Sequence, residues 1–144
     1  MPLNKTEFAS DIRAIATRLV RNLRQKHEDS SYSHVDLLTM SLIHEHGSLL
    51  PSELAQLERV SAQAISQVVQ KLHDDGCIKK AIDKNDKRKT TLSLTAKGKQ
   101  IMNKVWEQKN EWLVHAIDDL FSEKEIATIE KALPLLKRLS EHDK

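Results

Sequence analysis

The apolar residues of this chain recur every three or four positions over much of its length, a spacing that indicates amphipathic helices. The first stripe predicts a helix over residues 5–27, through Phe8, Ile12, Ile15, Leu19 and Leu23. Towards the other end, Thr95 and the pair Ser122 and Glu125 are placed to cap two further helices. Pro134 lies inside the last helix and is expected to kink it or to end its regular part. The sequence therefore predicts long helices at both ends.

Shorter elements are predicted between these long helices. Ser33 followed by Asp36 resembles a capping box, and it opens a helix that Gly47 is placed to end. A short helix over residues 51–58 comes next, with a proline in its first turn. Ser61 is a good N-cap for the helix that follows. The middle of the chain is thus predicted to contain three helices in close succession.

Two strand-like stretches, residues 77–82 and 90–94, follow and flank the polar heptapeptide DKNDKRK. This loop is too long for a tight turn but suits a protruding hairpin. Two short helices followed by a basic hairpin have the order of a winged helix-turn-helix. The predicted fold class is therefore mainly α: a winged helix-turn-helix with a two-stranded wing, plus N- and C-terminal helices.

Composition supports this class and excludes others. The chain has 144 residues, three Gly, three Pro and one cysteine, which suits a single helix-rich domain and excludes an internal disulfide or a cysteine-rich zinc framework. No apolar stretch approaches the roughly 20 residues of a membrane span, and residues 1–13 show no signal-peptide core. A cytoplasmic protein is expected.

The net charge of +2 conceals an uneven distribution. Residues 76–100 hold eight Lys and Arg against two Asp, a balance of +6, whereas the segments before and after it each have a balance of −2. A local basic region on a mildly acidic chain points to a polyanionic partner. On charge alone, a solvated lysine-rich loop explains the segment equally well.

The helix capped by Ser61 carries a polar row opposite its apolar face, formed by Gln63, Ser66, Gln67 and Gln70. Glutamine suits bidentate contacts with adenine in the major groove. A polar helix face is usually only solvated, but the adjacent loop adds cations that can reach phosphates or a minor groove. The candidate DNA-binding residues are Ser61, Gln63, Ser66, Gln67, Gln70, Lys71, Lys84, Asp86, Lys87, Arg88 and Lys89.

The hairpin also matches a known sequence pattern. Residues 83–88, DKNDKR, fit D-x-x-D-x-R, and residues 92–98, LSLTAKG, fit L-x-L-T-x-x-G. Residues 52–55, SELA, and residues 72–78, which fit L-x-x-x-G-x-I, are similar to the same family. On these motifs the chain resembles the MarR-type bacterial transcriptional regulators along nearly its whole length.

This resemblance implies a homodimer whose first and last helices form the dimerisation part. The implied segments are a dimerisation helix at 1–32, a winged helix-turn-helix at 33–98 and dimerisation helices at 99–144. It also implies a recognition helix at 62–75 in the major groove, and Arg88 in the minor groove, held by an ion pair with Asp86. Family members bind short pseudo-palindromes in double-stranded DNA and are often released by small aromatic or phenolic ligands, so a ligand-responsive repressor is expected.

The chain departs from the family pattern at several positions. Gln67 stands where many members have arginine, which weakens the readout of guanine. Glu58 and Arg59 stand where many relatives have leucine and glycine. Cys77 occupies a position where a buried leucine or isoleucine is usual, so it is expected to be a buried structural residue.

Catalytic and metal chemistry find little support. The sequence has no nucleophile elbow, phosphate loop or HExxH motif, so an enzyme is not expected. His44 and His46 are two residues apart and point to different helix faces, so they are interpreted as surface histidines rather than metal ligands. No cofactor is expected.

The alternative function is a homodimeric winged-helix adaptor that binds a protein and no DNA. The excess of six positive charges in residues 76–100 favours DNA, because a protein-binding wing does not need them. Retention on heparin or on nonspecific duplex, with a steep dependence on salt, distinguishes the two functions.

Overall fold

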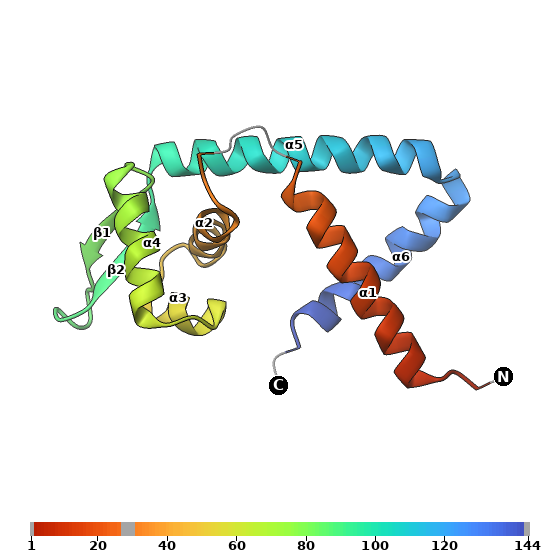
Figure 1. Cartoon of the computed structure of the whole chain (residues 1–144), viewed down its shortest axis with the longest axis horizontal. Coiled ribbons are helices and arrows are strands. Elements are labelled where there is room, and N and C mark those ends of the chain that lie inside the picture. Colours follow the sequence, from red (N-terminus) through yellow and green to blue (C-terminus); the bar gives the residue numbers. More distant parts are fainter. Residues whose placement is uncertain (1, 27–30, 143–144) are drawn as a thin grey trace. The chain divides into compact units, whose positions relative to one another are not determined.

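The computed structural model describes residues 2–26 and 31–142. This part of the chain forms six helices and a two-stranded sheet (Figure 1), in the order α1 (Lys5–Arg24), α2 (His34–His46), α3 (Pro51–Glu58), α4 (Ala62–Asp74), β1 (Ile78–Ile82), β2 (Thr90–Leu94), α5 (Ala96–Leu120) and α6 (Glu123–Ser140). The chain divides within α5 into two compact units, Met1–Gln108 and Lys109–Lys144. The mainly helical fold class with a two-stranded wing is confirmed.

The predicted helix caps are present. Ser33 and Asp36 form a complete capping box, in which the Asp36 N–H donates to Ser33 Oγ over 3.1 Å and the Ser33 N–H donates to Asp36 Oδ2 over 2.9 Å. Ser61 Oγ accepts the Ala64 N–H over 3.1 Å, and Ser122 opens α6 in a second capping box. These short-range bonds satisfy backbone donors that a helix start leaves unpaired, which is why the sequence predicted the helix starts well.

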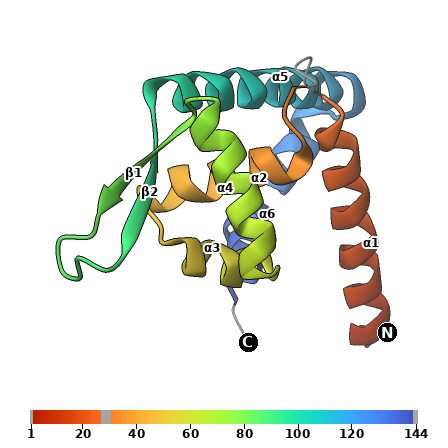
Figure 2. The ribbon, with the colours of Figure 1, turned by 60° about the vertical axis from the view of Figure 1, so that its left-hand side comes forward.

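The core of the first unit lies between the short helices and the sheet. Helices α2, α3 and α4 contact one another, and the β1–β2 hairpin contacts α2 and α4 (Figure 2). The strands pair in an antiparallel register that sets Ile78 opposite Leu94, and the backbone of Leu49 adds a bridge to Leu92. The largest wholly buried apolar side chains are Met40, Ile43, Leu54, Ile65, Leu72, Ile78, Leu92 and Met102.

Helix α5 begins directly against the root of the hairpin. A Cβ atom at Gly98 would lie 2.2 Å from the Cys77 carbonyl oxygen, so only glycine allows this approach. Thr95 Oγ1 accepts the Gly98 N–H over 3.1 Å and donates to the Gly76 carbonyl over 2.5 Å. The first turns of α5 join the core through Met102 and Val105. The wing is therefore held by α4, which precedes it in the chain, and by α5, which follows it.

Two predicted boundaries need correction. Helix α1 ends at Arg24, with Gln25 as its C-cap, and position 27 lies outside the described residues. Strand β1 begins at Ile78 rather than at 77, because the Cys77 N–H is committed to the Leu72 carbonyl over 2.8 Å. Pro134, which was expected to kink the last helix or to end its regular part, lies inside α6, and the helix continues past it to Ser140. A proline removes only one backbone donor, and the other turns of α6 remain helical.

The two terminal helices leave their apolar faces exposed. Neither α1 nor α6 contains a buried residue. In α1 the exposed large apolar side chains are Phe8, Ile15, Leu19 and Val20, and in α6 they are Ile129, Leu133, Leu135, Leu136 and Leu139. No helix in the described residues is both long enough and apolar enough to cross a membrane.

Candidate nucleic-acid interface

Helix α4 turns one face into the core and the opposite face outward. Ile65, Val69 and Leu72 are buried, which fixes the helix in place. The polar row on the other side is exposed as predicted, at Gln63, Ser66, Gln67 and Gln70, and Ser61 at the N-cap is exposed as well. Gln70 Nε2 donates to Asp74 Oδ1 within the helix over 2.8 Å. Helix α4 therefore presents its free amide groups on a rigid, well-anchored scaffold.

The side chain of Lys71, which the sequence grouped with the DNA-binding candidates, turns towards the start of α2. Its ammonium group forms a salt bridge with Asp36 at the start of α2 and donates to the Ser31 carbonyl over 3.3 Å. The side chain remains 45% exposed. Lys71 is thus engaged with the protein rather than directed outward with the glutamine row.

The wing loop is ordered by the carboxylate of Asp83. Asp83 Oδ2 accepts the Asp86 N–H over 3.1 Å, and the Asp83 N–H donates to the Lys89 carbonyl over 2.9 Å. The Lys89 N–H in turn donates to the Asp86 carbonyl over 3.0 Å. The candidate residues did not include Asp83, yet an aspartate that opens a turn and accepts a nearby backbone N–H is a recognisable signal.

At the tip of the wing, both carboxylate oxygens of Asp86 accept hydrogen bonds from the guanidinium group of Arg88. Arg88 Nε lies 3.1 Å from Oδ1 and Nη2 lies 3.2 Å from Oδ2, while the Arg88 N–H also donates to Oδ1 over 3.0 Å. These hydrogen bonds lower the pKa of Asp86. The Arg88 side chain is 91% exposed, so the ion pair that the resemblance implied holds this cation outward.

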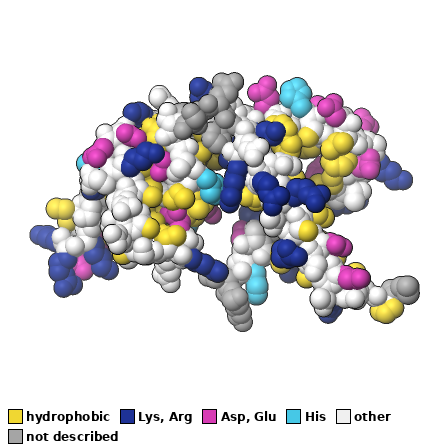
Figure 3. Space-filling view, in the orientation of Figure 1, with side chains coloured by type: hydrophobic (Ala, Val, Ile, Leu, Met, Phe, Trp, Pro, Cys, Tyr) yellow, Lys and Arg dark blue, Asp and Glu magenta, His cyan; other side chains and the backbone are white. Residues whose placement is uncertain are grey.

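Three lysines surround this ion pair. The side chains of Lys84, Lys87 and Lys89 are exposed, and none forms a salt bridge within the described part of the chain. Lys and Arg side chains gather at the tip of the hairpin (Figure 3). The arrangement concentrates positive charge at the end of a protruding element, where it can bind an anionic backbone.

The end of α3, before the turn to α4, has two unusual residues, Glu58 and Arg59. Thr39, which is wholly buried, donates its hydroxyl to Glu58 Oε2 over 2.8 Å. Burial raises the pKa of Glu58, and the Thr39 hydrogen bond offsets only part of that effect. Arg59 adopts the left-handed conformation with φ of 55°, at a position where many relatives have glycine, the residue that this conformation favours. The family pattern marked both positions as departures but could not supply the Thr39 contact.

Substituting Glu58 with Gln should make stability less dependent on pH. Folding raises the pKa of Glu58 above its ordinary value of 4.5. The contribution of Glu58 to stability is therefore fully present below pH 4.5, and it is lost as the pH rises through the pKa of the folded state. Glu58→Gln keeps an acceptor for Thr39 and removes the charge. At pH 7 its free energy of unfolding should exceed the parent's, and at pH 4 the difference should be smaller. Urea unfolding at pH 4 and pH 7 measures this, and lower stability at pH 7 would contradict it.

His44, His46 and Cys77, which are candidates for metal binding by residue type, lie in separate structural contacts. The described residues contain no group of three His, Cys, Asp or Glu side chains that could hold a metal ion. His44 packs edge-on against Trp106, with ring centroids 4.9 Å apart, and His46 Nδ1 lies 2.9 Å from the Leu42 carbonyl oxygen. Cys77 is buried, as predicted, with its Sγ 3.3 Å from the Tyr32 hydroxyl.

Comparison with known proteins agrees with this geometry. The profile of the MarR family matches residues 33–90. The chain is 28% identical over 117 residues to an uncharacterized HTH-type transcriptional regulator of Mycobacterium leprae, covering 81% of this chain and 82% of the relative. It is 29% identical over 113 residues to an HTH-type transcriptional regulator of Mycobacterium tuberculosis, covering 78% and 79%.

Solved structures extend the likeness to almost the whole chain. A proposed transcriptional regulator from Pseudomonas aeruginosa aligns with a TM-score of 0.87 and 28% identity, over 99% of this chain and 100% of that one. The transcriptional regulator Tm0710 from Thermotoga maritima aligns with a TM-score of 0.77 and 26% identity, over 94% and 95%. The fold of a MarR family protein from Bacillus stearothermophilus is also similar, with a TM-score of 0.82 and 20% identity over 98% and 100%.

Proposed function

The chain belongs to the MarR family of transcriptional regulators, and from this premise we propose that it is a ligand-responsive repressor that binds a pseudo-palindromic operator as a homodimer. Regulators of this family are not enzymes, which agrees with the expectation from sequence. The observation that carries the proposal is the outward guanidinium of Arg88, fixed by Asp86, in the same compact unit as the exposed glutamine row of α4.

We propose that α4 and the wing contact DNA in different ways. The side-chain amides of Gln63 and Gln67 form no hydrogen bond within the described residues, so they are available to base edges in the major groove. A guanidinium group is weakly hydrated and charged at every relevant pH, which suits the narrow, strongly negative minor groove. The lysines of the wing loop contact phosphates, which fixes the position of the protein without specifying sequence.

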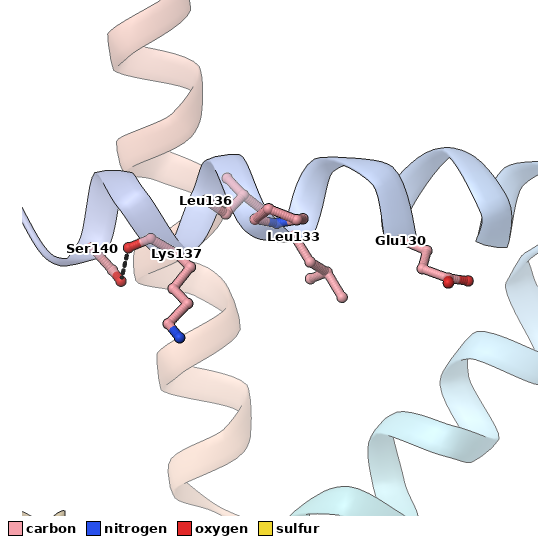
Figure 4. A pocket seen from close by; sticks show the side chains of 6 residues that line it. Glu130, Leu133, Leu136, Lys137 and Ser140 are labelled. Carbon is pink, nitrogen blue, oxygen red and sulfur yellow. Dashed lines mark hydrogen bonds between the residues drawn. The ribbon is translucent and has the colours of Figure 1, made fainter.

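We propose that segments 1–32 and 99–144 form the dimerisation part around the winged helix-turn-helix of residues 33–98. Exposed apolar faces on two long helices support this, because such surfaces are normally buried against a partner. Figure 4 shows part of this surface on α6, where Leu133 and Leu136 lie between Glu130, Lys137 and Ser140. A second copy of the chain would cover this face.

The proposed effector is a small aromatic or phenolic compound, and the proposed location is the cytoplasm, where the chromosome of a bacterium lies. Both proposals derive from the family resemblance. Thermal unfolding of the protein in the presence of a panel of phenolic carboxylates tests the effector, because a ligand that binds the folded state raises the melting temperature.

Replacing Gln67 with Ala tests readout of bases by α4. The parent's preferred duplex is compared with a scrambled duplex of the same length and salt concentration. If Gln67 contacts a base, the preference for the operator should fall by about 1–3 kcal/mol, while nonspecific affinity should change less. Gln56→Ala, an exposed glutamine on α3, serves as the control substitution. Equal losses on both duplexes would show that α4 does not read bases at this position.

A further inference from the structure

Asp36 is a buried carboxylate in the first turn of α2. It is only 3% exposed, and its Oδ2 accepts the Ser33 N–H over 2.9 Å and pairs with the ammonium group of Lys71. Burial alone would raise the pKa of Asp36, but the hydrogen bonds from Lys71 and Ser33 outweigh it and the pKa lies below its ordinary value. The carboxylate is therefore ionised at neutral pH, and Lys71 provides its counter-charge.

Lys71 connects this carboxylate to several other groups. It donates to the Ser31 carbonyl, and its ammonium lies 5.6 Å from the centre of the Tyr32 ring, within range of a cation–π interaction. The Tyr32 hydroxyl in turn lies 3.3 Å from Cys77 Sγ, just beyond the end of α4. The region around the beginning of α2 thus has two contacts with later parts of the chain. Asp36 pairs with Lys71 in the C-terminal half of α4, and Tyr32 contacts Cys77, which leads into the wing.

The position of Lys71 on α4 makes this connection relevant to DNA contact. Residues four apart lie on the same side of a helix, one turn from each other, so Lys71 lies one turn beyond Gln67 and beside Gln70. If Lys71 moved to a DNA phosphate, Asp36 would be left ionised and buried with no counter-charge, which is strongly unfavourable even though the Ser33 N–H still donates to it. The Lys71 ammonium is therefore better suited to holding α4 than to contacting DNA.

We propose that Lys71 is a positioning residue, which uses its salt bridge with Asp36 to set the orientation of α4 and so of Gln67 and Gln70 in the groove. This inference rests on the proposed function, because it gives Lys71 a role in operator preference. It replaces the direct DNA contact predicted for Lys71 from sequence. It also implies that a displacement of the beginning of α2 would be transmitted to α4 through the salt bridge between Asp36 and Lys71.

The test compares Lys71→Met, Lys71→Arg, Asp36→Asn and the Lys71→Met/Asp36→Asn double variant of the full-length protein. Lys84→Met is the matched control, because Lys84 is an exposed wing lysine without a salt bridge in the described part of the chain. Three quantities are measured for each protein: the free energy of unfolding at fixed protein concentration, the ratio of affinities for operator and scrambled duplex, and the slope of log affinity against log salt.

A positioning role predicts that Lys71→Met and Asp36→Asn each lower operator preference by about 3- to 30-fold. The double variant should lose no more than the worse single variant, both in preference and in stability, because the two residues act through one bond. The salt slope should stay close to the parent's, and Lys71→Arg, which keeps the charge, should retain most of the preference. Lys84→Met, at a proposed phosphate contact, should instead reduce the salt slope and weaken operator and scrambled duplex by a similar factor.

Opposite results would overturn the inference. If Lys71→Met lowers the salt slope by about two for the dimer and weakens operator and scrambled duplex equally, Lys71 is a phosphate contact. Unchanged operator preference in a folded Asp36→Asn protein, or additive stability losses, would equally exclude the link. If the Asp36→Asn protein does not fold, the comparison of Lys71→Met with Lys71→Arg decides. Equal operator preference in these two variants would then exclude the positioning role. Should no operator exist, the proposed function fails, while the stability cycle still reports whether the bond couples α2 to α4.

Discussion

Substitution of Arg88 with Ala is expected to weaken operator binding about a hundredfold or more, while the melting temperature and the oligomeric state remain those of the parent. The Arg88 side chain is 91% exposed, and within the described residues its guanidinium group hydrogen-bonds to Asp86 of the same loop, so its removal costs the fold little. In a dimer both wings are altered, and about 1.4 kcal/mol for each wing already amounts to a factor of about one hundred. Fluorescence anisotropy with labelled operator at moderate salt measures the loss of affinity.

Two neighbouring substitutions serve as controls for Arg88. Asp86→Ala should produce a milder loss, because Arg88 remains but is no longer held by the two carboxylate oxygens. Lys84→Ala should mainly flatten the dependence of log affinity on log salt, by roughly one unit for each phosphate that is no longer neutralised. If Arg88→Ala binds the operator as tightly as the parent, the wing is not a DNA element and the protein-adaptor function becomes the better account.

Introducing charge on the apolar face of α6 is expected to abolish the dimer. Leu133 and Leu136 are about half exposed in the single chain, at 55% and 48%, so covering the remaining surface against a partner would stabilise the dimer by about 0.8–1.5 kcal/mol for each side chain. Leu133→Glu combined with Leu136→Glu removes this contribution and adds the cost of burying two carboxylates. DNA affinity should fall with the dimer, because two linked half-sites bind more tightly than one.

Sedimentation velocity at micromolar concentration measures this effect. The parent should sediment as a species of twice 16.5 kDa and the double variant as a monomer. Lys131→Glu is the matched control, since it places a carboxylate on α6 at an exposed position outside the apolar surface. A parent protein that is already monomeric would contradict the proposed architecture, and a double variant that remains dimeric would place the interface elsewhere.

The parts of the fold that depend on neighbouring residues were predictable from sequence. Ser33 with Asp36, Ser61, and Ser122 with Glu125 act within one helical turn, and each begins a helix where the sequence indicated. The wing was equally evident, because two short strands surround a polar loop with a fixed pattern of acidic and basic residues. These signals are local, so they do not require knowledge of the tertiary structure.

The contacts that sequence reasoning missed join residues far apart in the chain. Asp36 and Lys71 are 35 positions apart, and Thr39 and Glu58 are 19 apart. Periodicity indicated which side of α4 faces outward but not that Lys71, on the flank of this side, turns back to a carboxylate of another helix. For Pro134 the sequence left two outcomes open, a kink or the end of the regular helix, and the helix continues past this residue to Ser140.

Selection of bound sequences from a random pool of duplex DNA tests the central claim most directly. The full-length protein is incubated with the pool at moderate salt in the presence of nonspecific competitor, and the retained duplexes are sequenced. A homodimer that reads bases through α4 and inserts Arg88 into the flanking minor groove predicts enrichment of one pseudo-palindrome with two inverted half-sites. Retention of DNA without any sequence enrichment, or no retention at all, would contradict the proposal that this chain recognises an operator.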